Sequence, residues 1–435
     1  MIKRTLLVIL AFLAAAGLHA QTFQNHLHVQ SCTQGRSWTA AQLVQNTLVG
    51  EGVQVSNVRF NGSSGVINCN GIGTFYTDNN APTTPIGLRE GILITTGSIQ
   101  GAPGPNSSAR LTTNYSCTSH PDPALIPLTG DNTSTLFHCS VLEFDFIPQT
   151  DSVGFRYVFA SEEYPEYTEE SFNDIFAFFV SGPNPNGGNY LDTNIAKIPG
   201  TNQPVSIHTI NDYTNDSYYI DNYPRQAAAR DTLQIEYDGF TTVLTAYVHV
   251  IPCSTYHLRI SLSDVNDSTF DSGVFLEAGS LSAKSLDVSM HSNNPVNDDQ
   301  SKFYESCCMD VVVKLKNPNS VHLTLEIFRN HINTTNSDFT IEPSLNENNT
   351  NPSIYQFPPN CDSLVFHICG TPDGIAEGLE RFRLGYRLQG ECNYRFDTLG
   401  VVNVNTFSLT TSTSNLNHSP VTIYANVNGG VPPYH

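Results

Sequence analysis

The stretch VGFRYVFASEEYPEYTEESFNDIFAFFVSGP, residues 153–183, contains the strongest structural signal in this chain. In its first part every second residue is apolar, and these residues are Val153, Phe155, Tyr157 and Phe159. Side chains at alternate positions share one face of a β-strand, so this part predicts a strand with one apolar face. Residues 175–180 are apolar throughout, as in a strand buried on both faces. The stretch therefore predicts two buried strands joined by a loop.

The joining loop is strongly acidic, and its carboxylates are Glu162, Glu163, Glu166, Glu169, Glu170 and Asp174. So many negative charges on a short loop repel one another unless something neutralises them. Glu162 and Glu163 follow the first strand directly, so we expect their side chains to be held in place rather than free in solvent. This loop is the first candidate cation-binding segment.

A second acidic turn, DVNDSTFD at 264–271, lies between two later strand-like runs. Calcium binds several oxygen ligands in flexible geometry, and Asp, Glu and Asn supply such oxygens. If both turns lie at one end of the same sandwich, their oxygens converge, and we predict calcium as the cofactor there. The predicted ligands are Glu162, Glu163, Asp174, Asp264, Asn266, Asp267 and Asp271. The alternative is a solvated turn in which Asp and Asn only cap the backbone, and the turn lacks the glycine and distal glutamate of an EF-hand.

The segment FASEEYPEYTEESFNDIFAFFVSGP, 159–183, resembles the central signature of the choice-of-anchor L domain. Further segments resemble this family in the same order: WTAAQLVQNTLVGEGVQVSNVRFNG (38–62), GLREGILITTG (87–97), VLEFDFIP (141–148), NIAKIPGTNQPVSI (194–207), YDGFTTVLTAYV (237–248) and SDVNDSTFDSGVFLEAGSL (263–281). The resemblance implies a secreted or surface-displayed domain of a Bacteroidota-type bacterium, attached through varied downstream anchors. It implies no established reaction.

Short apolar or alternating runs separated by Gly, Pro, Asn and Asp dominate the chain after Gly50, which predicts an all-β fold. Before this point, Thr39 is placed to cap a short helix that ends near Leu48. We expect a sandwich or jelly-roll-like β domain over 38–282, followed by an immunoglobulin-like β-sandwich over 286–405.

Two later segments resemble extracellular β modules. DGIAEGLERFRLGYRL, 373–388, resembles the last strands of Calx-beta-type sandwiches, and VTIYANVNGGVPPYH, 421–435, resembles the opening of a polycystic-kidney-disease-type repeat. Such a repeat continues well past this point, and one strand pair cannot bury a core. We therefore expect 406–435 to be the start of a truncated repeat, and the sequence to be a piece of a longer protein.

The N-terminus has the features of a secretory signal peptide over 1–20. Lys3 and Arg4 precede an apolar run, and cleavage after Ala20 would leave 21–37 as a lead segment. The run is too short to span a membrane comfortably, and no second long apolar segment follows, so we expect no membrane span in the mature chain. We predict a secreted or cell-surface protein, and in related bacteria such proteins often leave by a type IX secretion route.

The chain is acidic, with 40 Asp and Glu against 20 Lys and Arg and a net charge of −20 at pH 7. Removal of Lys3 and Arg4 with the signal peptide makes this −22. Such a charge argues against nucleic acid and anionic lipid as partners.

Ten cysteines in an exported chain predict disulfides, and no C-x2-C pair favours zinc. Five lie in the region before 283 and five in the region after it, so either one bridge joins the two regions or each region keeps a free thiol. Cys139 and Cys253 both border strands of the family-like motifs, and we predict that they pair. For the adjacent Cys307 and Cys308 we expect separate disulfide partners.

Three classes of function are compatible with these features. We favour a non-enzymatic structural or adhesion module that presents loops to an extracellular glycan or surface protein. A dedicated binding loop is the second, because NDYTNDSYYIDNYP at 211–224 suits polar recognition. Its candidate contacts are Tyr213, Tyr218, Tyr219 and Tyr223.

An extracellular glycoside hydrolase is the third class, because paired carboxylates serve such enzymes. Glu162, Glu163, Asp174 and Asp264 are the candidate pairs. The chain contains no G-x-S-x-G, H-E-x-x-H or P-loop motif, so we predict that the protein is not an enzyme.

Overall fold

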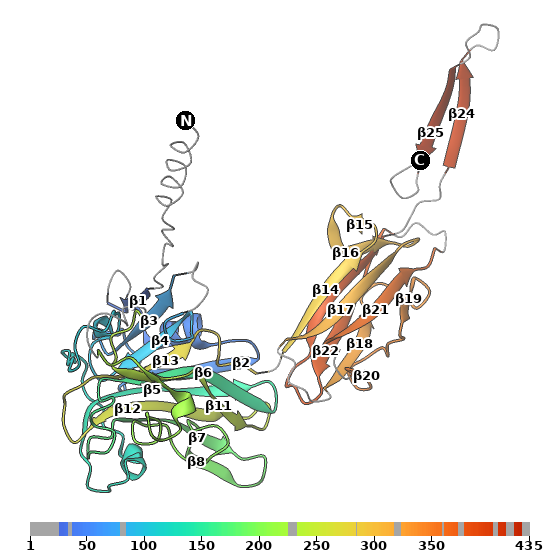
Figure 1. Cartoon of the computed structure of the whole chain (residues 1–435). Coiled ribbons are helices and arrows are strands. Elements are labelled where there is room, and N and C mark those ends of the chain that lie inside the picture. The colour runs from blue at the N-terminus through green and yellow to red at the C-terminus, as the bar shows by residue number, and fades with distance from the viewer. Residues whose placement is uncertain are drawn as a thin grey trace, which may run out of the picture.

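Strands make up nearly all of the regular structure in the computed structural model (Figure 1). The structure describes residues 26–33, 37–78, 84–224, 233–283, 285–316, 323–358, 361–372, 378–402, 408–414 and 422–428. The predicted signal peptide, 1–20, lies outside these residues. The all-β fold class predicted from the sequence is confirmed.

Two antiparallel sheets form a β-sandwich in the first part of the chain. The larger sheet has the order β1 (Leu27–Ser31), β3 (Ile72–Thr77), β4 (Glu90–Thr95), β13 (Ser272–Glu277), β6 (Ser152–Ser161), β10 (Gly239–Thr241) and β9 (Tyr219–Asp221), and β11 (Leu244–His249) also pairs with β6. The smaller sheet has the order β2 (Val53–Phe60), β5 (Leu136–Pro148), β12 (Tyr256–Val265), β7 (Ile175–Pro183) and β8 (Asn189–Asn194). Strand β1 lies in the segment 21–37, which the sequence analysis treats as a lead segment, and it pairs with β3 at the edge of the larger sheet.

The two sheets share one apolar core. The predicted alternating row on β6 belongs to it, and its members are Val153, Phe155, Tyr157 and Phe159. The intervening Val158 and Ala160 join a second cluster on the other face of the same sheet. Strand β7 alternates in the same way: Phe176, Phe178 and Val180 lie in the main core, and Ile175, Ala177 and Phe179 lie in a cluster on its other face. Both strands are therefore buried on both faces.

A short helix lies between β1 and β2, in the segment where the sequence predicted one. Helix α2 (Ala40–Leu43) continues directly into the π-helix η1 (Val44–Leu48). The Thr39 side chain accepts a hydrogen bond from the Gln42 amide at 3.2 Å, and the Gln42 side chain accepts one from the Thr39 amide at 3.0 Å. Three 3₁₀ turns are η2 (Ile99–Gly101), η3 (Pro123–Leu128) and η4 (Asp216–Tyr218). None of the helices in the described ranges has the length and hydrophobicity to cross a membrane.

A second sandwich follows (Figure 1). Its smaller sheet has the order β14 (Ser285–Ser292), β17 (Cys308–Lys316), β21 (Ser363–Gly370) and β19 (Phe339–Glu342). Its larger sheet has the order β15 (Pro295–Val296), β16 (Asp299–Tyr304), β23 (Arg395–Val402), β22 (Leu379–Leu388), β18 (Thr324–His331) and β20 (Ser353–Gln356). Both sheets contribute to one core, in which Val311 and Phe366 face Ile327 and Phe382.

The last described strands, β24 (Ser408–Ser414) and β25 (Thr422–Asn428), form a two-stranded antiparallel sheet. They lie in the segment predicted to open a truncated repeat. The immunoglobulin-like topology of the second sandwich, the domain boundaries and the nature of this repeat stay predictions.

The predicted Cys139–Cys253 disulfide is wrong. Cys253 bonds to Cys392, and Cys139 is a buried free thiol. The register explains this: Ser140 of β5 pairs with Leu262, whereas Cys253 precedes β12 and its amide donates to the Pro148 carbonyl at 2.9 Å. The two cysteines therefore lie at opposite ends of the β5–β12 pair.

Two further bridges, Cys69–Cys117 and Cys308–Cys369, each lie within one sandwich. Cys307, for which we expected a partner of its own, carries a free thiol. The sequence analysis left open whether one disulfide joins the two regions. Cys253–Cys392 is such a disulfide.

Proteolysis without reductant, followed by mass spectrometry, should yield a peptide that links Cys253 to Cys392. Serine at both positions removes the disulfide between the sandwiches and leaves only the polypeptide chain to join them, so we expect a larger radius of gyration by small-angle scattering. The matched control is Cys361→Ser, which replaces an exposed free thiol. A linked Cys139–Cys253 peptide would contradict this connectivity.

Candidate cation site

At one end of the first sandwich, inward-facing rows of apolar side chains on three strands end in carboxyl groups. On β6 the row continues beyond the strand to Glu163, on β7 it begins at Asp174, and on β12 it ends at Asp264. Alternate residues share a face of a strand, so the pattern directs all three carboxyls to the same end of the core. These three residues are named the inner carboxyl group below.

The inner carboxyl group is almost completely buried, with each residue 1% exposed. Asp174 is held on both oxygens: the Ser272 hydroxyl donates to Oδ2 at 2.7 Å, and the Val265 amide donates to Oδ1 at 3.1 Å. Glu163 differs, because its Oε2 is buried and has no hydrogen-bond partner within the described residues. A buried carboxyl oxygen without a partner is costly, so this atom needs a proton or a cation.

Burial is the main cause that raises the pKa of each member of this group. It raises the pKa of Glu163 to about 11, and the charges of Asp174 and Asp267 add to this effect. Burial, followed by the charge of Asp264, raises the pKa of Asp174 well above its usual range. The pKa of Asp264 is also raised well above its usual range, mainly by burial. Without a cation, burial therefore favours the protonated form of all three carboxyls.

The surroundings of the inner carboxyl group provide little positive charge. Within the described ranges, no lysine or arginine forms an ion pair with Glu163, Asp174 or Asp264. His138 Nδ1 lies 3.0 Å from Asp264 Oδ2. Burial lowers the pKa of His138, against the opposing charge of Asp271, so this contact is a hydrogen bond of a neutral imidazole at neutral pH.

Two predicted ligands on the second acidic turn already have structural partners. The Asn266 side chain accepts from the Thr135 amide at 3.0 Å and donates to the Ser171 carbonyl at 2.7 Å, so it links two loops. Asp267 Oδ1 accepts from the Thr269 amide at 3.0 Å, as in an Asx turn. Asp267 is only partly buried and lies at the rim of the group.

The remaining predicted ligands, Glu162 and Asp271, belong to another set of carboxyls. Burial, then the charges of Asp238, Glu236 and Asp271, raises the pKa of Glu162 to about 11. Asp271 Oδ2 accepts from the Thr113 amide at 2.9 Å and from the Thr113 hydroxyl. The predicted residues therefore fall into two sets rather than one.

Sequence reasoning missed Glu236 and Asp238, which are 4% and 0% exposed. They flank the buried Tyr237 in the segment that leads into β10. The sequence contains a signal for them, because acidic residues alternate with the apolar Ile235 and Tyr237, as in a buried strand. This spacing does not show that the segment lies beside Glu162. In the first loop, Glu166, Glu169 and Glu170 are exposed.

Among the residues that the structure describes, no three His, Cys, Asp or Glu side chains are arranged to hold a metal ion together. Calcium also accepts backbone carbonyls, amide carbonyls and water. A calcium ion at the inner carboxyl group would therefore take part of its coordination from such oxygens, or the carboxyls would move toward it.

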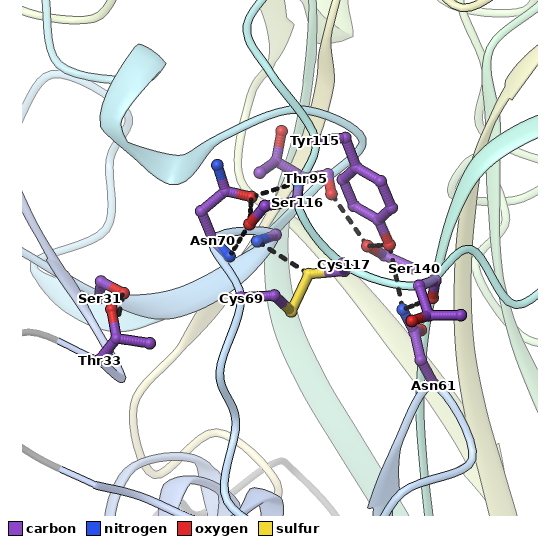
Figure 2. The surroundings of a disulfide bond; sticks show 12 residues. Ser31, Thr33, Asn61, Cys69, Asn70, Thr95, Tyr115, Ser116, Cys117 and Ser140 are labelled. Atoms are coloured by element: carbon purple, nitrogen blue, oxygen red, sulfur yellow. Dashed lines mark hydrogen bonds between the residues drawn. A yellow bond between two sulfur atoms is a disulfide. The ribbon is translucent and has the colours of Figure 1, made fainter.

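A hydrolase would need carboxyls that a sugar can reach. The four candidates, Glu162, Glu163, Asp174 and Asp264, are at most 2% exposed. A pocket of about 220 Å³ lies beside the Cys69–Cys117 bridge, and its lining, from 60–69 and 116–118, contains no carboxyl group. Figure 2 shows this bridge and the polar residues around it. The burial of these four carboxyls argues against their use as a hydrolytic pair.

The tyrosines of the predicted binding loop differ in exposure. Tyr213 is 80% exposed. Tyr218 and Tyr219 are partly buried and pack against the main core, and the Tyr219 ring lies 4.9 Å from the Tyr164 ring. Tyr223 is also partly buried. Packing accounts for Tyr218 and Tyr219, and a ligand at this loop stays a prediction.

Fold and site together define an all-β protein of two sandwiches, the first with buried carboxyls at its strand ends. A family model described as the choice-of-anchor L domain matches residues 30–282, more than half of the chain. The chain therefore belongs to the choice-of-anchor L domain family. A search of curated proteins found no match.

One solved structure, described as the apo-form of the Calx CBD1 domain, is similar to part of this chain. The sequence identity is 18%, the match covers 27% of this chain and 96% of that one, and the TM-score is 0.18. A likeness at this level supports no conclusion about function.

The raised pKa values predict how the stability of the cation-free protein depends on pH. The pKa of Glu163 is about 11 in the folded state, against an ordinary value of 4.5, so the folded chain binds more protons between these values. In EDTA, the urea midpoint should therefore fall as pH rises from 5 to 8. His138 has a lowered pKa and acts in the opposite direction, so a control is needed.

The control is Glu163→Gln/Asp174→Asn, whose amides do not titrate. This variant should lose much of the downward slope. An unchanged slope in the variant would contradict this assignment of the buried protons.

Proposed function

We propose that this protein is a secreted or cell-surface, non-enzymatic module that presents loops for adhesion or surface assembly. We further propose that calcium stabilises its first sandwich at the inner carboxyl group. The observation that carries the proposal is the burial of Glu163, Asp174 and Asp264 without a lysine or arginine partner among the described residues. Membership of the choice-of-anchor L family and three disulfides support an extracellular setting.

In this proposal, calcium neutralises the buried carboxylates of the inner carboxyl group. Burying an unpaired charge costs several kcal/mol per ion, so the three carboxyls either keep their protons or gain a cation. Calcium supplies two positive charges and prefers oxygen ligands. Glu163 would offer its unpartnered Oε2, and the partly exposed Asp267 would provide a route from solvent. Extracellular modules bind calcium with a Kd of about 10⁻⁴–10⁻³ M, which suits a modest site of this kind.

The partner in this proposal is an extracellular glycan or a surface protein. The loop around Tyr213 is the candidate contact surface, because this side chain is 80% exposed on the first sandwich. A Bacteroidota-type origin and type IX secretion belong to the same proposal.

Calcium should raise the melting temperature of the full chain relative to EDTA. At a free calcium concentration of about 100 Kd, mass action adds ~2.7 kcal/mol. This corresponds to roughly 5–10 °C at ~2–4 °C per kcal/mol. Asp174→Asn/Asp264→Asn removes two carboxylate ligands at nearly constant shape, so it should remove the part of the shift that the inner carboxyl group contributes.

The matched control is Glu169→Gln/Glu170→Gln, which removes the same charge from exposed positions of the same loop. It should keep the full shift. If calcium leaves the wild-type midpoint unchanged, calcium has no part in stabilising this protein.

The location can be tested independently of calcium. In the native bacterium, the mature chain should begin at Gln21 and be recovered from the medium or by protease treatment of intact cells. N-terminal sequencing and cell fractionation measure this. Recovery of the full-length chain only from the cytoplasm would overturn the proposed setting.

A further inference from the structure

A second set of buried carboxyls lies on the opposite side of β6 from the inner carboxyl group. The Glu162 amide still donates to the Asp271 carbonyl at 3.0 Å, so the strand alternation continues past the end of β6. Glu163 therefore faces the core between the sheets, whereas Glu162 faces the side occupied by Val158 and Ala160. Two consecutive glutamates are thus directed to different environments.

The segment that leads into β10 brings Glu236 and Asp238 to Glu162. The charges that act most strongly on Glu162 are those of Asp238 and Glu236, in this order. Burial and the charges of Glu166, Glu236 and Asp221 raise the pKa of Asp238 to about 8. This set, Glu162, Glu236 and Asp238, is named the outer carboxyl group.

One loop, residues 104–113, covers the outer carboxyl group. The Ser107 amide donates to both Glu236 oxygens at 3.0 Å, and the Ser108 amide donates to Oε1 at 3.2 Å. The Asn106 side chain donates to Asp238 Oδ1 at 2.7 Å. The loop thus supplies hydrogen-bond donors to two of the three carboxyls.

The loop is also held close to the sandwich at both ends. A Cβ at Gly104 would lie 2.5 Å from the Ile235 amide nitrogen, so only glycine permits this approach. Beyond the other end, the Cys69–Cys117 bridge and hydrogen bonds at 2.8–2.9 Å from Ser116 to the Asn70 side chain anchor the chain (Figure 2).

Two oxygens of the outer carboxyl group remain without a partner. Glu162 Oε2 and Asp238 Oδ2 are buried, on residues that are 2% and 0% exposed, and neither forms a hydrogen bond within the described chain. Gly239 pairs with Ser161 in antiparallel register, so Asp238 and Glu162 occupy the next opposed positions on the two segments. The side-chain and backbone donors of Asn106, Ser107 and Ser108 go to Glu236 and to the other oxygen of Asp238.

We propose that Glu162 Oε2 and Asp238 Oδ2 bind a second divalent cation, calcium, which fastens the 104–113 loop to the first sandwich. Glu236 acts as a positioning residue, because its oxygens are occupied by the loop amides. Calcium is the proposed ion because it prefers oxygen ligands, and both unpartnered atoms are carboxyl oxygens. This inference rests on the proposed function only for the identity of the ion, since the two carboxyl groups use different residues.

Equilibrium dialysis of the full chain against calcium tests the second site. We expect two calcium ions per wild-type chain and one per chain of Glu162→Gln/Asp238→Asn. Glu163→Gln/Asp174→Asn should also retain one ion, and the exposed control Glu169→Gln/Glu170→Gln should retain both. Amides replace the carboxyls at nearly constant volume, which preserves packing.

The outcomes separate the two proposals. If Glu162→Gln/Asp238→Asn binds as many ions as the wild type while Glu163→Gln/Asp174→Asn loses one, the second site is overturned and the proposed function stands. If only Glu162→Gln/Asp238→Asn loses an ion, the second site stands and calcium binding at the inner carboxyl group is overturned.

Hydrogen exchange gives a readout that does not depend on the variants folding. Calcium should slow amide exchange in 104–113 of the wild-type chain by about tenfold or more, and it should do so in Glu163→Gln/Asp174→Asn as well. Exchange in this loop that is the same with calcium and with EDTA would overturn the second site.

Discussion

Buried negative charge at the end of an apolar core is the constraint on which the first sandwich depends. Three strands that meet in one core each place a carboxyl at the same end, and the described chain offers no lysine or arginine to pair with them. An unpaired buried charge costs several kcal/mol, whereas a whole domain is stable by only about 5–15 kcal/mol. The fold therefore requires protons or a cation at this end, and its stability is coupled to both.

The loops and bridges around this end follow from the same constraint. Loop amides and hydroxyls donate to Glu236, Asp238 and Asp271, and the Cys69–Cys117 bridge anchors the segment that carries these donors. At the opposite end of the β5–β12 pair, Cys253 bonds to Cys392 of the second sandwich. One end of the first sandwich thus carries the acidic chemistry, and the other carries the covalent connection.

Much of the fold could be predicted from local pattern. The alternating row on β6, the two-sided burial of β7 and the Thr39 cap all depend on residues close in sequence, and all three are confirmed. The prediction of a Cys139–Cys253 disulfide was wrong. Which cysteines meet depends on the register of strands more than a hundred residues apart, and residue spacing does not encode this register. Tyr218 and Tyr219 stay predicted ligand contacts, but a polar loop sequence does not show that both rings also pack partly against the core.

The sequence by itself determined the all-β fold, the buried strands on both sides of the acidic loop, and the candidate carboxyls of the two turns. These follow from the period of two in a strand and from charge density, which are local properties. Only the tertiary structure decided that Glu162 and Glu163 face different environments, and that Glu236 and Asp238 join the former. The reason is physical: the cost of a buried carboxyl depends on what surrounds it in space, and those neighbours come from distant strands.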